Sequence, residues 1–248
     1  MAARVYTLAQ RPRLRAEFSR LHGVAWPPFL RDDAVNAVWP RLYSQFPACQ
    51  IALCDDAGHV VAIGNGIPIV WDGTRRGLPD RIVDVITRGC QARALCALAA
   101  IVDPGQRTRG LSSKIVLAMR DVAARHGLAS LVAPVRPSLK GRYPLPPMSR
   151  YARWTRDDGT PFDPWFRVHA RLGARVLRIT PRGNTVVASV KDWEERTGMA
   201  FPVSGRYIVP DAFQPIVVDR ERDRVHYDEA NVWMLHRVPL QQEDDPPG

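Results

Sequence analysis

The chain has 248 residues, of which 46% are hydrophobic and 24% charged, a balance typical of a soluble globular protein with a substantial core. Its apolar runs are too short to span a bilayer and its N-terminus has no signal-peptide core, so we expect a cytoplasmic protein that does not enter a membrane. The net charge of +10 is compatible with a nucleic acid, a phosphate-bearing ligand or an acidic protein partner.

The cysteines give no sign of a metal site. Cys49, Cys54, Cys90 and Cys96 form no Cys-x-x-Cys pair, and no histidines stand beside them at zinc-finger spacing. Because Cys49, Cys54 and Cys96 lie in apolar runs, we expect buried free thiols.

The chain begins with a predicted strand over residues 4–8. Helices are predicted over residues 12–22 and 32–43, the first ended by Gly23 and the second weakened by Pro40. Two apolar runs then flank a turn sequence and predict a hairpin, followed by a short helix; these are residues 49–54, 60–70 and 78–87.

The centre of the chain carries its strongest pattern. Residues 94–102 are almost wholly apolar and do not alternate, which predicts a buried central strand. A helix over residues 111–126, ended by Gly127, leads to another buried strand at residues 131–135. This order of strand, helix and strand predicts two parallel neighbouring strands.

Between the central strand and its helix lies a loop rich in glycine, arginine and hydroxyl residues, 103–113. A helix start offers unpaired N–H groups and the positive end of its dipole, and Gly110 lets the main chain approach an anion. We therefore predict that Arg107 and Arg109 contact a phosphate group, although exposed loop arginines are also common without a ligand. Asp103 is expected to shape this turn.

The C-terminal part of the sequence is less regular. A helix over residues 163–172 is predicted from Asp163 as its cap and Pro164 in its first turn. Shorter elements are predicted after it: strands at 174–180, 185–190, 207–209 and 216–218, and a helical turn at 192–197. Residues 241–248 are expected to be frayed.

Arg107-Thr108-Arg109-Gly110-Leu111-Ser112 resembles the Gln/Arg-x-x-Gly-x-Gly/Ala signature of the GNAT superfamily of N-acetyltransferases, with Ser112 in place of the usual small residue. A second match supports this resemblance: His169-Ala170-Arg171-Leu172-Gly173-Ala174 has the spacing of the Tyr-x-x-x-Gly-Phe pattern in which members of the family end a later helix. The resemblance covers about residues 3–180, so we divide the chain into a GNAT-like domain, 1–180, and a C-terminal extension packed on it, 181–248.

The resemblance implies an α/β fold with a mixed central sheet that splays open beside residues 94–102. It also implies an acyl-CoA, most simply acetyl-CoA, as co-substrate, with no metal. The coenzyme would lie along Ile101 and Val102, with its diphosphate on the loop and helix start, formed by Arg107, Thr108, Arg109, Gly110, Leu111, Ser112 and Ser113.

The implied reaction is direct attack of an amine on the thioester. His169 stands where the family has a tyrosine that commonly serves as the acid, and its reference pKa of about 6.5 suits a proton donor. The alternative is that His169 only satisfies a backbone group at a helix end. No general base is evident: Asp103, Asp84 and Asp163 are weak candidates, and Cys96 is expected to pack in the core rather than carry an acyl group.

A basic stretch over residues 136–156 is interleaved with aromatic residues. It suits a solvated loop over the active site better than a nucleic-acid surface, and it also suits docking of an acidic carrier protein. We expect an acyltransferase acting on a small-molecule amine. The alternatives are an enzyme that works with a carrier protein, a non-catalytic acyl-CoA-binding regulator and a nucleic-acid-binding module, and a homodimer is left open.

Overall fold

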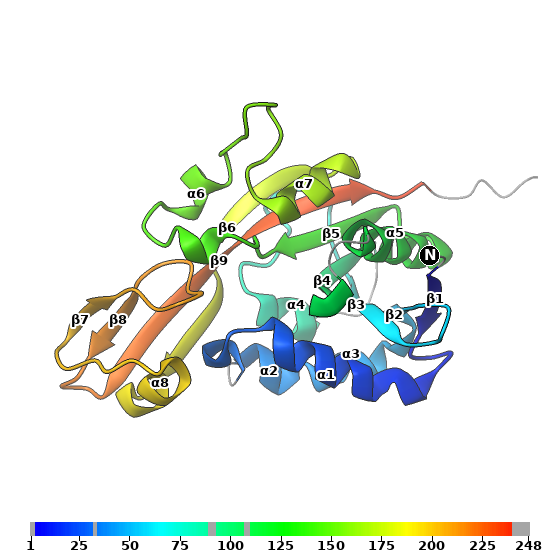
Figure 1. The fold of residues 1–248 in the computed structure, drawn as a ribbon. Coiled ribbons are helices and arrows are strands. Elements are labelled where there is room, and N and C mark those ends of the chain that lie inside the picture. The colour runs from blue at the N-terminus through cyan, green and yellow to red at the C-terminus, as the bar shows by residue number, and fades with distance from the viewer. Residues whose placement is uncertain (1–2, 32–33, 89–92, 107–109, 240–248) are drawn as a thin grey trace, which may run out of the picture.

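A mostly antiparallel sheet of nine strands forms the centre of the part of the chain that the computed structural model describes, residues 3–31, 34–88, 93–106 and 110–239 (Figure 1). The strands follow the order β1-β2-β3-β4-β5-β9-β8-β7, and β6 pairs with β9. Their bounds are β1 Arg4–Thr7, β2 Gln50–Cys54, β3 Val60–Ile69, β4 Ala94–Val102, β5 Ser130–Val135, β6 Arg175–Ala188, β7 Gly205–Tyr207, β8 Ile216–Asp219 and β9 Arg224–Arg237.

Helices cover both faces of the sheet. Figure 1 shows α1 to α3 along one face and α5 and α7 on the other. The helices are α1 Arg15–Ala25, α2 Ala34–Val38, α3 Pro40–Gln45, α4 Ile82–Arg88, α5 Leu111–Arg125, α6 Met148–Tyr151, α7 Pro164–Arg171 and α8 Val190–Thr197. Short 3-10 turns lie at Pro12–Leu14, Pro28–Leu30, Pro47–Cys49, Pro104–Gln106 and Lys140–Arg142.

The apolar composition of β2, β3 and β4 explains why helices cover both faces of the sheet at these strands. Their residues are buried on both sides, which is the pattern expected of a sheet between two helix layers. Ile115 and Met119 of α5 pack on one face, and Phe18 and Leu21 of α1 pack on the other. The predicted mixed α/β sheet and the predicted hairpin of β2 and β3 are therefore confirmed.

The N-terminal helices differ from the prediction at two points. Gly23 does not end α1, which continues to Ala25, because a glycine is tolerated within a helix at a cost of about 1 kcal/mol when packing favours the helix. Pro40 does more than weaken the second helix, since it divides it into α2 and α3. A proline inside a helix removes one backbone hydrogen bond, whereas at the first turn it fits well.

Two predicted strands, 174–180 and 185–190, are instead one bent strand, β6. Its pairing with β9 shifts between Thr180 and Asn184, so the short polar interval is an irregularity inside the strand. Val190 is the first residue of α8, and Ser189 caps that helix.

The strand β9, which pairs with β5, β6 and β8, is a continuous strand that the sequence pattern does not predict. Residues Val232–Arg237 pair with β5, and residues Val217–Asp219 of β8 pair with the start of β9. Along its opposite edge β9 pairs with β6 over Val225–Leu235. Residues that come last in the described sequence thus complete the sheet beside β5.

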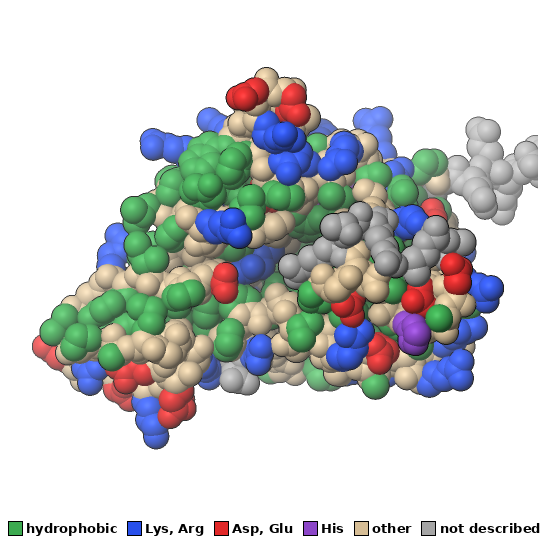
Figure 2. All heavy atoms as spheres, viewed as in Figure 1, with side chains coloured by type: hydrophobic (Ala, Val, Ile, Leu, Met, Phe, Trp, Pro, Cys, Tyr) green, Lys and Arg blue, Asp and Glu red, His purple; other side chains and the backbone are tan. Residues whose placement is uncertain are grey.

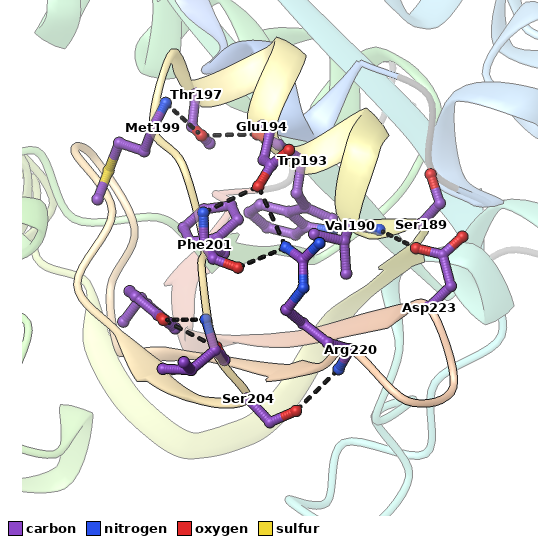
Figure 3. Close-up of polar contacts among 12 residues, drawn as sticks. Ser189, Val190, Trp193, Glu194, Thr197, Met199, Phe201, Ser204, Arg220 and Asp223 are labelled. Atoms are coloured by element: carbon purple, nitrogen blue, oxygen red, sulfur yellow. Dashed lines mark hydrogen bonds and ion pairs between the residues drawn. The ribbon is translucent and has the colours of Figure 1, made fainter.

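The helix α8 and the strands β7 and β8 form a small lobe, whose polar contacts are drawn in Figure 3. Glu194 accepts a hydrogen bond from the Phe201 N–H, and the Arg220 guanidinium donates to the Phe201 carbonyl. Asp223 caps the entry to α8 by accepting from the Val190 N–H. Trp193 of α8 is fully buried and stacks against Phe29, which joins the lobe to the N-terminal helical layer.

The surface viewed in Figure 2 mixes basic and acidic side chains, and on this face the lysines and arginines are dispersed rather than gathered in one stripe. Hydrophobic side chains gather over the β7–β8 lobe. Within the described ranges, no helix combines the length and apolar character needed to cross a bilayer.

Candidate functional site

The sheet opens between β4 and β5. These strands are parallel, as predicted, but they pair only at Leu95 with Leu131 and at Cys96 with Val132. Beyond this point they diverge around a cavity of about 500 Å³, lined by residues 97–102 of β4 and 133–135 of β5. An extended ligand can hydrogen-bond to main-chain groups exposed along such an opening. Ile101 and Val102, both predicted to contact the coenzyme, lie on this wall.

A bulge shapes the β4 wall. Asn65 of β3 pairs with Ala99 and Gly66 pairs with Ala97, so Leu98 between them has no register partner. A bulge re-aims main-chain and side-chain groups and is common beside active sites. Leu98 lines the cavity, which places the irregular stretch of backbone at the opening.

The start of α5 reaches the same cavity. Gly110 adopts φ +68°, a left-handed conformation that favours glycine, and a β-carbon added to it would meet no atom of the described residues within 4 Å. Leu111 is buried and anchors the helix start, whereas Ser112 lines the cavity. The first-turn N–H groups of an α-helix, here including Ser113, have no partner within the helix. The predictions for Arg107, Thr108 and Arg109 fall outside the described residues.

Asp103 shapes the turn before this helix, as predicted. Its carboxylate accepts from the Gly105 N–H at 3.0 Å and from Arg20 at 2.9 Å. Arg20, together with the Gly105 N–H, lowers the pKa of Asp103. Asp103 is thus held as an anion by α1, and it does not line the cavity.

His169 of α7 lines the cavity and is 3% exposed. Its Nδ1 lies 2.8 Å from Nε2 of His236 on β9, and its own Nε2 has no hydrogen-bond partner among the described residues. Burial, with a smaller effect of His236, lowers the pKa of His169 to about 3. The ring is therefore neutral near pH 7, so a proton-transfer role would begin from neutral imidazole rather than from imidazolium.

Asp163 positions the helix that carries His169. As predicted, it caps α7, accepting from the Trp165 N–H at 2.8 Å. The same buried carboxylate also accepts from the Leu139 N–H at 2.8 Å and from the Tyr151 hydroxyl at 2.8 Å. One side chain thus joins α6, α7 and the segment after β5, which identifies its role as structural.

A second buried polar network begins at His22 on α1, which lines the cavity. The Trp26 indole donates to His22 Nδ1 at 2.9 Å, so His22 Nε2 carries the proton and donates to Asn65, also at 2.9 Å. Asn65 donates onward to Gln50 at 3.0 Å, and burial lowers the pKa of His22. Both ring nitrogens are engaged, so this histidine orients the wall formed by Trp26 and Trp39.

A third network, absent from the sequence-based prediction, lies on the β9 side. Arg136 donates to both carboxylate oxygens of Glu229, at 2.9 and 3.0 Å, and the Tyr227 hydroxyl donates to Glu229 at 2.8 Å. Burial opposes the charge on Arg136, but Glu229 outweighs it and raises the pKa of Arg136. Both Arg136 and Glu229 line the cavity. Composition carries no signal for this pair, because its members are far apart in sequence.

Two further candidates from the sequence, Cys96 and Asp84, do not line the cavity. Cys96 is fully buried in an apolar cluster, and burial raises the pKa of its thiol, so it packs in the core as predicted. Asp84 pairs with Arg81 at 2.8 Å, outside the cavity. Cys90 lies outside the described residues.

The basic stretch is more ordered than a solvated loop. Lys140 is 1% exposed, where its ammonium donates to the carbonyls of Tyr143 and Phe213, and burial lowers its pKa to about 8. Tyr143, Tyr151 and Trp154 pack against one another with ring centroids 5.1–6.1 Å apart. These rings are used in internal packing rather than presented as a platform for bases.

Comparison with known proteins agrees with this architecture. No protein-family model matches the chain. The chain is similar to the arginine N-acetyltransferase avaD of Aspergillus versicolor. The two sequences are 27% identical in a comparison that covers 86% of this chain and 85% of that protein.

Two solved structures are similar over nearly the whole chain. The loading GNATL domain of CurA from Lyngbya majuscula has a TM-score of 0.63 and 17% identity, covering 96% of this chain and 98% of that one. The GphF GNAT-like decarboxylase in complex with isobutyryl-CoA has a TM-score of 0.63 and 19% identity, covering 95% and 100%. The protein therefore has the GNAT fold that its sequence motifs predicted.

Proposed function

We propose that this protein is an acyl-CoA-dependent N-acyltransferase that moves an acetyl or other short acyl group from coenzyme A to an amine of a small molecule. The observation that carries this proposal is the cavity between β4 and β5, which has the start of α5 at its wall. The similarity to an arginine N-acetyltransferase supports it independently.

The coenzyme would lie along the opened edge of β4. Amide groups of its pantetheine arm would pair with the main chain at Ile101 and Val102. Its diphosphate would bind the first-turn N–H groups of α5, including those of Ser112 and Ser113, where the helix dipole favours an anion. Arg107, Thr108, Arg109, Gly110 and Leu111 complete the proposed cradle.

The reaction needs a donor for the oxyanion and a residue that moves a proton. We assign the first to the main-chain N–H at the Leu98 bulge, since the bulge leaves this residue unpaired in register. We assign the second to His169, which lines the cavity with one ring nitrogen unpartnered by any described residue. The thioester carbonyl would then lie between these two groups.

The acceptor would enter the part of the cavity walled by Trp26 and Trp39. Indole faces attract cations, contributing about 0.5–2 kcal/mol depending on desolvation. This supports an acceptor that carries a cationic group beside its amine, and arginine, the substrate named for the relative, is the first candidate.

The test is a screen of amines with acetyl-CoA, read by release of the free CoA thiol and by mass of the product. We expect arginine to be acetylated and acetyl-CoA to raise the melting temperature of the protein. Stabilisation by acetyl-CoA without turnover of any amine would instead support the acyl-CoA-binding regulator. Transfer only to the phosphopantetheine thiol of an acidic carrier protein would support the carrier-dependent alternative.

A further inference from the structure

The ion pair between Arg136 and Glu229 turns its cationic member toward the cavity. The Glu229 side chain is 3% exposed, whereas that of Arg136 is 21% exposed, and both residues line the cavity. All three hydrogen bonds that Arg136 makes to described residues leave from Nε and Nη2, so Nη1 keeps its two N–H groups. The guanidinium also lies over the Phe213 ring, 4.0 Å from its centroid. Arg136 is thus held in place with donors to spare.

Asn231 adds a neutral donor two residues farther along β9, on the same side of the strand as Glu229. Asn231 is 6% exposed and lines the cavity. Its buried Oδ1 has no hydrogen-bond partner among the described residues, and a β-carbon added to Gly183 would lie only 1.9 Å from it. Glycine at position 183 therefore makes room for this amide. Its Nδ2 makes no hydrogen bond to a described residue either, and it is not fully buried.

The alternation of side chains along β9 decides which face of the sheet these donors occupy. Tyr227 contacts Phe29 of the N-terminal layer, with ring centroids 5.5 Å apart, whereas Val232 packs in a cluster with Phe166 of α7. Because successive side chains of a strand point to opposite faces, the odd-numbered residues, Asn231 among them, face the N-terminal layer. The tryptophans of the proposed acceptor region lie in that layer, and α5 and α7 cover the opposite face (Figure 1).

We infer that Arg136 Nη1 and Asn231 Nδ2 bind a carboxylate of the acceptor, so that the acceptors are amino acids rather than amines without a carboxyl group. This inference rests on the acyl transfer proposed above and names its substrate class. A carboxylate has two oxygens for the two donors, and a planar guanidinium is well suited to it. A few fixed polar groups in an otherwise apolar pocket are what orients a small ligand.

The state of Glu229 favours an anionic over a cationic ligand at this point. One of its oxygens accepts from Arg136 Nε, and the other accepts from Arg136 Nη2 and from the Tyr227 hydroxyl. The carboxylate is therefore both enclosed and occupied, and it offers little to a cation in the cavity. It also balances the Arg136 charge while the site holds no ligand, which removes the cost of an unpaired buried cation.

A carboxylate could also belong to the acyl group of the coenzyme instead of the acceptor. The face of the sheet favours the acceptor, because Asn231 lies on the side of the N-terminal layer and the start of α5, where the diphosphate is proposed to bind, lies on the other. The experiments below separate the two sources.

Calorimetric titration of the full wild-type chain in the presence of coenzyme A tests the inference without turnover. Three amino acids are each compared with the amine that remains when the carboxyl group is removed: arginine with agmatine, lysine with cadaverine, and phenylalanine with phenethylamine. We expect at least one amino acid to bind about 10-fold to 100-fold more tightly than its partner, the range for hydrogen bonds to a charged group. Equal or weaker binding of all three amino acids, or no binding by any of them, would overturn the inference.

Two variants assign the preference to these side chains. Asn231→Leu removes the amide at similar size, and Arg136→Lys keeps a cation beside Glu229 without the guanidinium fork. Either variant, if its melting curve shows that it folds, should reduce the ratio of the two affinities to less than about threefold. The exposed Arg150→Lys variant, outside the cavity, is the matched control and should keep the full ratio. A full ratio in the folded variants would show that the carboxylate is bound elsewhere.

Malonyl-CoA, which carries a carboxylate on its acyl group, tests the other source. We expect Arg136→Lys to change the affinities for malonyl-CoA and acetyl-CoA equally. A selective loss of malonyl-CoA binding would assign the carboxylate to the acyl group and overturn the inference. If amino acids bind as expected but none is acylated by acetyl-CoA, the proposed function fails while the carboxylate site stands, so the two failures are distinguishable.

Discussion

The two walls of the cavity are built in different ways. The wall formed by β4 and the start of α5 offers mainly backbone and apolar side chains, and its residues are continuous in sequence. The opposite wall, from β5, α7 and β9, carries buried polar pairs, Arg136 with Glu229 and His169 with His236. Under the proposed function, the coenzyme site is therefore encoded by residues close together in sequence, whereas the proposed proton-transfer site depends on long-range packing.

The sharpest test of this division is His169→Phe. It should lower kcat about 100-fold to 10,000-fold, the usual range for a residue that transfers a proton, because the cavity loses the ring nitrogen assigned to that step. The affinity for acetyl-CoA, measured by calorimetry, should change less than about threefold, since the proposed coenzyme contacts lie on the other wall. Equal losses of turnover and affinity would show that both walls bind the coenzyme.

Replacing Glu229 tests the polar wall as a structural unit. Glu229→Gln leaves the Arg136 cation without its buried counter-charge, so the free energy of unfolding should fall by about 3 kcal/mol. Chemical denaturation measures this change. Glu195→Gln on the surface, where Glu195 lies 3.8 Å from Lys191, is the matched control and should cost less than about 1 kcal/mol.

Gly110→Asp tests the backbone wall. An aspartate there adds negative charge at the helix start, so acetyl-CoA binding should weaken about 100-fold, or about 2.7 kcal/mol, with the fold retained. Gly110→Asn adds a side chain of the same size without charge and tolerates positive φ. If both variants bind equally, charge at this helix start plays no part in recognition.

Asp163→Asn tests how the polar wall is positioned. The amide can accept fewer of the hydrogen bonds that the carboxylate now receives from α6, α7 and the segment after β5, so we expect a loss of about 2 kcal/mol by thermal or chemical denaturation. Asp158→Asn, in an exposed turn closed by Thr160, should have a much smaller effect.

The pH dependence of stability should reveal the histidine pair. Both pKa values are lowered by burial, His169 to about 3 and His236 to about 4, so below the unfolded value of about 6.5 the unfolded chain binds protons that the folded chain does not. Stability is therefore lost as pH falls from about 6.5 toward 4, with a slope of up to about 1.4 kcal/mol per pH unit for each histidine.

Denaturation of the wild type and of His169→Phe across pH 4–7 measures this slope, which should be smaller in the variant. An identical slope in both proteins would mean that burial does not lower the pKa of His169 in the folded protein.

The sequence was informative where structure is determined locally. The apolar run of β4 has the predicted bounds, and Asp163 and Pro164 correctly indicated the start of α7. The predicted splay of the sheet followed from the GNAT resemblance and matches the short pairing of β4 with β5. In contrast, β9 was not predicted, because this long strand pairs with β5, β6 and β8, and no local pattern records such pairings.

By itself, the sequence determined the central strand β4 and the helix start that follows it, because both depend on residues adjacent in the chain and on backbone geometry. The opening beside β4 was predicted only through the resemblance to the GNAT superfamily. Only the tertiary structure decided what faces that opening from the other side. His236 reaches His169, and Glu229 reaches Arg136, across 67 and 93 residues. Their pairing depends on burial, since a charge or ring nitrogen removed from water requires a partner that only the folded chain can supply.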